Sequence, residues 1–323
     1  MKVLVTGGAG FIGSNFVRMI ADGRLNGYSE ITVLDKLTYA GVMPNLDSAR
    51  MIPNYRFIQG DICDADLVRS ILSDIDSIIN FAAESHVDRS ILNSREFIQT
   101  NIVGVQVLLD EIKAQDRNIR LLQVSTDEVY GSILSGSWNE EAALHPNSPY
   151  SSSKAGGELL AMSYFQTFGI DVVVTRSSNN YGSHHFPEKL IPLFITNIIQ
   201  GKKLPIYGDG KNVRDWLHVD DHCRGIHLAL TKGKSGSVYN IGGGCELSNL
   251  EITNLLLSLM GADNECVEFI EDRKGHDFRY SVDWSKIQRD LGYRPEIEFA
   301  GGLQATVDWY KKNEAWWKPL KNA

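Results

Sequence analysis

Thr6-Gly7-Gly8-Ala9-Gly10-Phe11-Ile12-Gly13 (TGGAGFIG) is the stretch of sequence that decides the fold. A strand is predicted before it over residues 2–6, and a helix is predicted after it over residues 13–21. Further short apolar strands are predicted over residues 30–34, 56–59, 77–81, 121–125 and 171–175, with helices between them, notably over 101–113 and 152–168. Parallel neighbours need crossover connections, which are usually helical, so this alternation predicts an α/β fold with a doubly wound, Rossmann-type parallel sheet.

The glycines of this stretch have separate roles in the predicted strand–loop–helix unit. Gly7 permits a tight turn, Gly10 lets the backbone approach a pyrophosphate, and Gly13 allows close packing of helix on strand. A glycine motif alone is often only a turn, but its position here favours a dinucleotide-binding loop. We expect Phe11 and Ile12, in the same loop, to lie against the cofactor.

The alternation of short strands and helices ends after about Ser177, where prolines and glycines occur in longer loops. We expect residues 1–177 to form the dinucleotide-binding domain, with later returning segments near 215–241. Residues 178–214 and 242–323 are expected to form a smaller substrate-binding domain. Within the returning segments, residues 237–241 are predicted as a strand that rejoins the large sheet.

Composition narrows the class of protein. The 323 residues are 43% hydrophobic and 22% charged, as in a folded soluble protein. The formal net charge of −8 provides no global attraction to nucleic acid or to an anionic membrane. No signal-peptide pattern and no apolar run of membrane-spanning length is evident. The four cysteines are scattered, which favours free thiols in a reducing compartment, so a cytoplasmic location is expected.

An acid follows the second predicted strand, where a dinucleotide-binding fold places its ribose contact. The Asp35 carboxylate can accept both ribose hydroxyls and would repel a 2′-phosphate, which favours NAD over NADP, although Lys36 weakens that exclusion slightly. Asp61-Ile62, after the third strand, can bracket the adenine, but a lone Asp at a strand end is more often a helix cap. After the fourth strand come small side chains where a cofactor passes close, or simply a tight loop: Phe81, Ala82, Ala83 and Ser85.

Two sets of proton-transfer groups occur in the middle of the chain. Tyr150 and Lys154 are four residues apart and can share a helical face, where the ammonium favours the phenolate and makes it a usable base. Asp127 and Glu128 follow the strand over 121–125 and offer a second acid/base pair. Acids in this position also suit a helix N-terminus. A hydride-transfer enzyme needs one base, so this chain carries groups for two kinds of chemistry.

Several motifs resemble a known family over essentially the whole chain. TGGAGFIG and Tyr150-Ser-Ser-Ser-Lys154 resemble the extended short-chain dehydrogenase/reductase superfamily. More specific are the stretches AAESHVD (82–88), STDEVYG (125–131), SNNYG (178–182), HFPEKL (185–190) and DRKGHD (272–277). That set is similar to the dTDP-glucose 4,6-dehydratases. Lys274 departs from the family, which often has proline there, and leaves the preference for the base less certain.

The resemblance implies a three-step reaction on a nucleotide sugar. Tyr150 removes the proton of the C4 hydroxyl while hydride leaves C4 for NAD, and Thr126 orients that oxygen. The C4 ketone makes the C5 proton acidic, so that Glu128 acts as base at C5 and Asp127 as acid to the departing C6 hydroxyl. Water leaves, and the hydride returns to C6. The division between the two carboxylates stays open, because neighbouring acids split their pKa values in an order that sequence does not reveal.

The resemblance also implies binding residues and an assembly. The cofactor is expected to contact, in addition, Lys36, Leu37, Thr38, Ser85, Thr100, Tyr150, Lys154 and Asn180. The substrate, dTDP-glucose, is expected to contact Ser85, Thr126, Asn179, Lys189, Leu190, Pro205, Ile206, Tyr207, Arg214, Asn249, Arg273 and His276. A homodimer through the helices at 101–113 and 152–168 is expected. No metal is expected, since His184-His185 and Asp220-Asp221-His222 have simpler uses in capping and hydrogen bonding.

Three other functions compete with a dehydratase. A nucleotide-sugar 4-epimerase uses the same fold, NAD and tyrosine, but needs no acid/base pair for C5 and C6. A decarboxylase of a nucleotide uronic acid would want a cation near C6. A non-catalytic NAD-binding regulator would be expected to lack Tyr150, Lys154 or the acids. The pair Asp127-Glu128 therefore favours the dehydratase.

Overall fold

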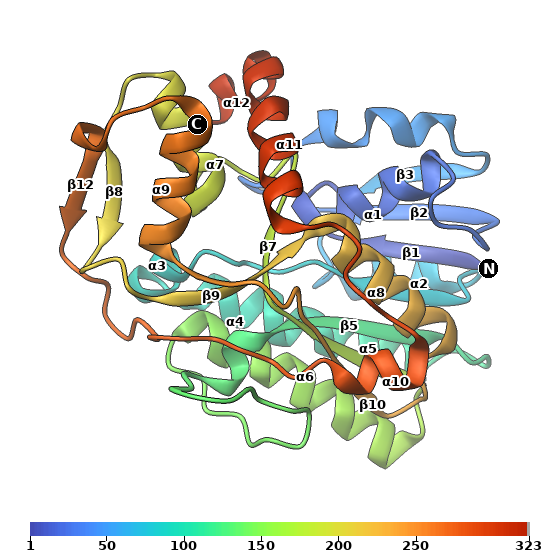
Figure 1. Cartoon of the computed structure of the whole chain (residues 1–323). Coiled ribbons are helices and arrows are strands. Elements are labelled where there is room, and N and C mark those ends of the chain that lie inside the picture. Colours follow the sequence, from blue (N-terminus) through green and yellow to red (C-terminus); the bar gives the residue numbers. More distant parts are fainter. Residues whose placement is uncertain (322–323) are drawn as a thin grey trace.

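The larger half of the molecule is built on one parallel sheet. The computed structural model describes residues 1–321, and its seven-stranded sheet has the order β3-β2-β1-β4-β5-β6-β10 (Figure 1). The strands are β1 (Lys2–Thr6), β2 (Glu30–Asp35), β3 (Tyr55–Gln59), β4 (Ser77–Asn80), β5 (Arg120–Thr126), β6 (Val172–Ser177) and β10 (Ser237–Ile241). All six pairings are parallel. The predicted doubly wound sheet is confirmed, including the strand that returns at its edge.

Helices cover both faces of this sheet, because successive side chains of a buried strand point to opposite sides. In β1, Val3 and Val5 belong to one core and Leu4 to the other. The helices with residues in the first core are α1 (Phe11–Ala21), α8 (Val219–Lys232) and α10 (Ser285–Leu291). Those in the second core are α2 (Ala65–Leu72), α5 (Gly104–Lys113) and α6 (Pro149–Phe168).

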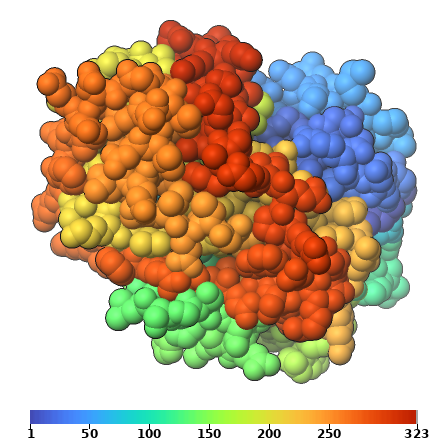
Figure 2. Space-filling view, in the orientation of Figure 1, coloured from blue at the N-terminus to red at the C-terminus, as the bar shows by residue number. Residues whose placement is uncertain are grey.

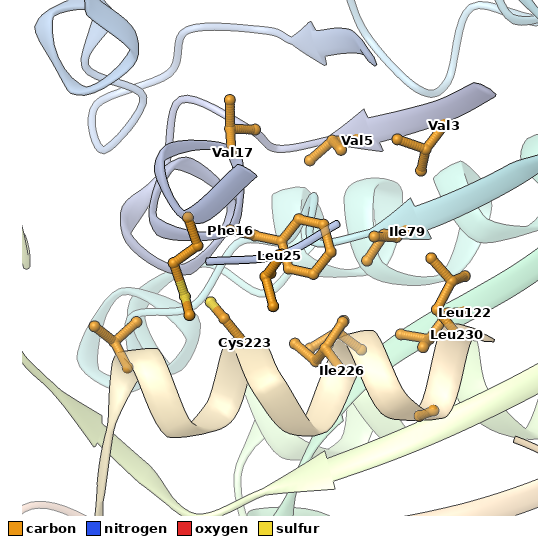
Figure 3. Packing of buried hydrophobic residues seen from close by; sticks show 14 of the residues in the cluster. Val3, Val5, Phe16, Val17, Leu25, Ile79, Leu122, Cys223, Ile226 and Leu230 are labelled. Carbon is orange, nitrogen blue, oxygen red and sulfur yellow. The ribbon is translucent and has the colours of Figure 1, made fainter. Parts of the chain in front are cut away.

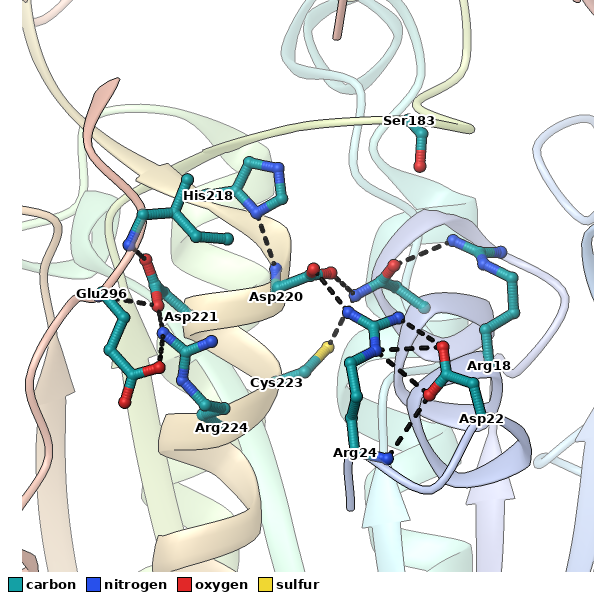
Figure 4. A network of polar contacts seen from close by, with 12 residues as sticks. Arg18, Asp22, Arg24, Ser183, His218, Asp220, Asp221, Cys223, Arg224 and Glu296 are labelled. Carbon is teal, nitrogen blue, oxygen red and sulfur yellow. Dashed lines mark hydrogen bonds and ion pairs between the residues drawn. The ribbon is translucent and has the colours of Figure 1, made fainter. Parts of the chain in front are cut away.

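Helix α8 shows how late sequence is fixed to the first half. Its buried residues Cys223, Ile226 and Leu230 share one core with Phe16 and Leu122 (Figure 3). At its N-terminal end, Asp220 accepts a hydrogen bond from Asn15 Nδ2 at 2.8 Å and pairs with Arg24 at 2.6 Å (Figure 4). Apolar packing and polar contacts therefore hold α8 against α1.

The smaller half contains two short sheets and its own core. One sheet has the order β11-β9-β7 and the other pairs β8 with β12. The elements are β7 (Asn179–Tyr181), α7 (Leu190–Ile199), β8 (Leu204–Tyr207), β9 (Val213–His218), β11 (Glu246–Ser248), α9 (Asn249–Met260), β12 (Val267–Ile270), α11 (Phe299–Lys312) and α12 (Glu314–Leu320). Tyr181, Phe194, Trp216 and Trp317 are buried together there. On the face shown in Figure 2, this late part of the chain lies against the N-terminal residues. The division into two domains at the stated residues stays a prediction.

Three helix starts differ from the sequence prediction. Helix α1 begins at Phe11 rather than at residue 13. Helix α6 begins at Pro149 rather than 152, because Ser148 and Ser151 form a capping box. The helix expected over 101–113 begins instead with a π-helical turn, η2 (Gln99–Val103), which follows α4 (Arg95–Ile98). The remaining short helices are η1 (Met43–Met51), α3 (Val87–Leu92), η3 (Asp127–Tyr130) and η4 (Asn264–Cys266). Among residues 1–321, no helix has the length and apolar character needed to cross a membrane.

Candidate active site

The glycine-rich loop has the geometry that its sequence predicts. Gly7 has a φ of +64°, and a Cβ there would lie 2.6 Å from the backbone nitrogen of Ala82. A Cβ on Gly13 would lie 2.5 Å from the carbonyl oxygen of Gly7, so the helix approaches the turn more closely than any side chain allows. Gly10 caps α1, whose N-terminus borders a cavity of about 300 Å³. An N-terminus of this kind favours a phosphate.

Asp35 ends β2 and organises the same loop. Its carboxylate accepts the N–H of Ala9 at 2.8 Å and the N–H of Leu37 at 2.8 Å. Burial raises the pKa of Asp35, and these two hydrogen bonds oppose the rise. Asp35, Lys36 and Thr38 line the cavity, whereas Leu37, which donates its N–H to Asp35 and packs against the first core, is not among the lining residues. The predicted ribose acid is thus held in place by the loop that it faces.

Asp61 lies farther along the cavity and is paired with Lys36. Lys36 Nζ is 2.8 Å from one Asp61 oxygen, and the other accepts the N–H of Cys63 at 2.9 Å. Burial raises the pKa of Asp61, but the bonds to Lys36 and Cys63 outweigh it and the pKa is lowered. The cap of α2 is Asp64, so capping that helix does not explain Asp61. The rest of the expected cofactor set also lines this cavity: Gly7, Gly10, Phe11, Ile12, Gly13, Ile62, Phe81, Ala82, Ala83, Ser85, Thr100, Tyr150, Lys154 and Asn180.

Tyr150 and Lys154 lie in the first two turns of α6 and line one end of this cavity. Lys154 Nζ donates to the carbonyl oxygen of Val124 at 2.7 Å, and burial lowers the pKa of Lys154 to about 8. Burial raises the pKa of Tyr150, the charges of Glu128 and Asp127 raise it further, and a hydrogen bond with Thr126 opposes them. Tyr150 therefore needs a positive charge nearby before it can act as a base.

The two carboxylates follow the end of β5, and Thr126 positions both of them. Thr126 Oγ1 accepts the N–H of Glu128 at 3.3 Å and donates to Asp127 Oδ1 at 3.2 Å. Asp127 is 2% exposed, and its Oδ2 has no hydrogen-bond partner among residues 1–321. Burial raises the pKa of Asp127 well above its usual value, and the charges of Glu128 and Asp215 add to this. Burial also raises the pKa of Glu128, but Arg214 and Lys189 oppose it.

These environments distinguish the two acids. Asp127 combines a strongly raised pKa with a free carboxyl oxygen, which suits a group that carries a proton into the reaction. Glu128 faces two cations that favour its ionised form, which suits a base. Both acids also sit in the first turn of η3, so the helix N-terminus and the acid/base interpretation describe the same two residues.

A second cavity, of about 310 Å³, adjoins the first one. Ser85, Glu128, Asn179, Asn180 and Lys189 line both. The expected substrate contacts from the smaller half also line it: Leu190, Pro205, Ile206, Tyr207, Arg214, Asn249, Arg273 and His276. Thr126 lines the first cavity rather than the second. The structure thus brings the predicted substrate set together beside the predicted catalytic groups.

Three cations converge on the second cavity. Arg214 lies over the Tyr280 ring at 4.2 Å and donates to the carbonyl oxygen of Asp277 at 3.0 Å. Arg273 lies over the Tyr207 ring at 4.5 Å and pairs with Asp88 at 3.2 Å. Lys189 Nζ donates to the carbonyl oxygen of Ser85 at 2.8 Å. Such a set suits a ligand with two phosphates.

Some lining residues were missed by the sequence prediction. Glu188 lines both cavities, and its Oε1 has no partner within residues 1–321 although its Oε2 pairs with Arg89 at 3.1 Å. Asp277 lines the second cavity, where it accepts from Tyr280 at 2.7 Å and Asn147 at 2.6 Å. Glu188 lies in the motif HFPEKL and Asp277 in the motif DRKGHD, so these motifs could have pointed to both acids. The contacts that the two acids make across the fold have no signal in the sequence.

Comparison with known proteins gives a consistent result. Residues 4–306 match the family described as GDP-mannose 4,6 dehydratase. A dTDP-glucose 4,6-dehydratase of Streptomyces niveus is 54% identical, over 100% of this chain and 96% of that protein. The solved structure of DesIV, the dTDP-glucose 4,6-dehydratase of Streptomyces venezuelae with NAD and TDP bound, has a TM-score of 0.97 and 55% identity, and covers 99% of this chain and 100% of that one. A UDP-glucuronic acid 4-epimerase of Bacillus cereus is 31% identical with a TM-score of 0.90, covering 97% and 99%.

Proposed function

The chain belongs to the nucleotide-sugar 4,6-dehydratase family, and we propose that it is an NAD-dependent hydro-lyase that converts dTDP-glucose to dTDP-4-keto-6-deoxyglucose and water. The observation that carries the proposal is the Asp127-Glu128 pair, buried within the same cavity as Tyr150 and Lys154. A redox step at C4 needs only Tyr150 and Lys154. Asp127 and Glu128 provide, in addition, the acid and base groups for an elimination.

The first cavity fits NAD. Where Gly7 and Gly13 stand, a side chain would collide with backbone atoms, so the loop can only be this narrow with glycine, and the N-terminus of α1 opens beside it. Asp35 and Asp61 would hold the ribose and adenine ends, and Tyr150, Lys154 and Asn180 the nicotinamide end. When bound, NAD accepts a hydride from C4 of the sugar and later returns it to C6.

Tyr150, Lys154 and Thr126 serve the oxidation at C4. The phenolate of Tyr150 takes the C4 hydroxyl proton, and Thr126, which lines the same cavity, holds the same oxygen in place. Lys154 supplies a positive charge that favours the phenolate form of Tyr150 and so opposes the effect of burial on its pKa. Its ammonium is oriented by the carbonyl oxygen of Val124.

Glu128 and Asp127 serve the elimination across C5 and C6. Glu128, whose ionised form Arg214 and Lys189 favour against the effect of burial, removes the proton from C5 once C4 is a ketone. Asp127 keeps its proton because it is buried, and delivers that proton from its free oxygen to the departing C6 hydroxyl. Water is released, and Glu128 then holds the proton that C5 regains.

The second cavity would bind the nucleotide diphosphate. Lys189, Arg214 and Arg273 would neutralise the two phosphates, with Asn179 and His276 beside them. Pro205 and Tyr207 on β8 would provide the wall for the base, with Leu190 and Asn249 at its rim. Ser85 lines both cavities and would contact the sugar between them.

A homodimer through α5 and α6 and a cytoplasmic location complete the proposal. Leu159 on α6 is 58% exposed, and Ile98, just before η2, is 49% exposed. Apolar side chains exposed on neighbouring helices suit a helix-to-helix contact between two copies. The four cysteines are free, as expected for a reducing compartment.

The test is a product assay with dTDP-glucose and UDP-glucose in parallel. We expect the dTDP-sugar to lose one water and to become a 4-keto-6-deoxy sugar, with UDP-glucose turned over more slowly. The Asp127→Asn variant is the matched control, because it should form no such product while still binding NAD. A product that keeps its 6-hydroxyl and is inverted at C4 would identify an epimerase instead.

A further inference from the structure

The proposed reaction places an unusual demand on cofactor binding. The same NAD is reduced and reoxidised within one turnover, so it must stay bound while sugars enter and leave. The contacts that hold the glycine-rich loop from behind therefore matter for retention of the cofactor. Two paths of contacts reach this loop from the C-terminal helices α11 and α12, which lie between α9 and α1 in Figure 1.

The first path passes through His185. Its ring stacks on Phe11 of the glycine-rich loop, with centroids 4.0 Å apart and planes 10° from parallel. Both residues line the first cavity. Tyr310 of α11 is fully buried and donates its hydroxyl to the carbonyl oxygen of His185. Burial lowers the pKa of His185 to about 3, so its ring is neutral at physiological pH and suits apolar stacking.

The second path passes through Asn45 of η1. Trp316 Nε1, on α12, donates to Asn45 Oδ1 at 2.9 Å. Asn45 Nδ2 in turn donates to the carbonyl oxygen of Ala9 at 3.0 Å, inside the loop itself. Asn45 is 2% exposed, and its amide oxygen and amide nitrogen each make one of these two bonds. Ala9 is also the residue whose N–H binds Asp35.

The two paths are joined at their C-terminal end. Trp317 Nε1 donates to the carbonyl oxygen of Tyr310 at 2.8 Å, and the Trp309 and Trp316 rings are 5.1 Å apart. The His184 ring lies 4.2 Å from that of Trp309. Helices α11 and α12 therefore form one packed unit that holds the loop at Phe11 and at Ala9 together.

We propose that α11 and α12 clamp the cofactor-binding loop, with Tyr310 and Trp316 as positioning residues that act through His185 and Asn45 to slow the release of NAD. This inference rests on the proposed function for the identity of the cofactor. Neither residue touches the reacting atoms. Their effect belongs to cofactor binding rather than to the chemical steps.

The experiment uses Tyr310→Phe and Trp316→Phe in the full chain. Each removes one donor and leaves an aromatic ring at the position; Tyr310→Phe keeps the same ring, and Trp316→Phe replaces the indole by a smaller phenyl ring, as Trp138→Phe does in the control. Tyr293→Phe and Trp138→Phe are matched controls, because Tyr293 is 1% exposed and donates to Gly242 at 3.1 Å, and Trp138 donates to Gly131 at 3.3 Å. NAD release is measured without sugar, from the NAD content after gel filtration and from the dissociation rate in competition. Melting temperatures are recorded for all variants.

We expect NAD to leave each clamp variant roughly 3- to 10-fold faster than the parent, as the loss of one hydrogen bond predicts. The controls should match the parent in NAD release even if their melting temperatures fall, and kcat of the clamp variants at saturating NAD should stay within about 2-fold of the parent. Unchanged release in both clamp variants, or equal acceleration in the controls, would overturn the clamp. A parent that retains NAD but leaves dTDP-glucose intact would instead contradict only the proposed function.

Discussion

At the scale of single residues, the site holds polar groups in an environment that disfavours their charged forms. Burial raises the pKa values of Asp127, Glu128 and Tyr150 and lowers that of Lys154. The sequence predicted which residues these are, because their motifs are local. It could not predict that Lys154 binds the Val124 carbonyl or that Asp127 Oδ2 has no partner within residues 1–321, since burial and long-range contacts determine both.

The raised pKa of Asp127 makes this carboxyl a cost to folding at neutral pH. Its pKa in the unfolded chain is near 3.8, and in the folded protein it is well above that. The folded state therefore binds a proton that the unfolded state has released, so the stability contributed at low pH is lost as pH rises from about 4. Asp127→Asn, which stays neutral, should raise the melting temperature at pH 8 by roughly 2–4 °C, corresponding to about 1 kcal/mol. The gain should shrink towards pH 4.

Differential scanning calorimetry at several pH values measures this effect. Asp209→Asn is the control, because Asp209 is exposed and has a lowered pKa through Lys211, so its loss should bring no gain. An Asp127→Asn variant that is less stable than the parent at pH 8 would be incompatible with a buried, proton-binding Asp127.

Glu128→Gln tests the division of labour between oxidation and elimination. Without a base at C5, exchange of the C5 proton with solvent deuterium should be lost and kcat should fall by roughly 10²- to 10⁴-fold. Oxidation at C4 depends on Tyr150 and should persist, visible as absorbance of the reduced cofactor. If that absorbance is lost as well, Glu128 has a role in the first step and the assignment is wrong.

At the scale of elements, α6 connects the proposed catalytic residues to the core. Besides Tyr150 and Lys154 it carries Glu158, which forms a buried ion pair with Arg176 of β6 at 2.5 Å. Its first turn was missed because Ser148 and Ser151 cap each other, whereas the usual signal has Glu or Gln in the second position. The π turn η2 was also missed. It contains the buried Asn101, which donates to Ser153 of α6 at 2.8 Å, and such a contact depends on tertiary structure.

The close approach of α6 to η2 predicts the effect of a single methyl group. A Cβ on Gly157 would lie 2.2 Å from the carbonyl oxygen of Asn101, so Gly157→Ala must push the two helices apart. We expect it to destabilise the protein by roughly 1–3 kcal/mol in urea unfolding. Gly301→Ala in α11 is the control, since its nearest neighbour would be 3.8 Å away, and alanine should be neutral or slightly stabilising there. Equal stability of the two variants would contradict the tight packing.

At the scale of the whole molecule, the carboxyl ends of the parallel strands and the smaller half enclose two adjoining cavities. The alternation of strands and helices predicted the sheet, including β10 at its edge, because its strands are short and most of them are buried, apolar runs. It could not predict how residues after 178 fold back. The bond from Tyr310 to His185 spans 125 residues and has no local signal.

The proposed dimer can be tested on the outer face of α6. Leu159→Glu should convert a dimer to a monomer in analytical ultracentrifugation, because it places a charge in the apolar helix contact. Phe269→Glu on β12 is the matched control: both side chains are 58% exposed, so neither change should unfold the chain. A parent that is monomeric, or a Leu159→Glu variant that stays dimeric, would rule out this interface.

The most direct test of the proposed dehydratase reaction follows one hydrogen from C4 of the substrate to the product. dTDP-glucose carrying deuterium at C4 is incubated with the protein, and the product is examined by NMR and mass spectrometry. We expect a 4-keto-6-deoxy sugar with the deuterium at C6, because Tyr150 and the Asp127-Glu128 pair are proposed to act around one bound NAD. Deuterium that remains at C4 of an intact sugar, or a product whose C6 still carries its hydroxyl, would contradict it.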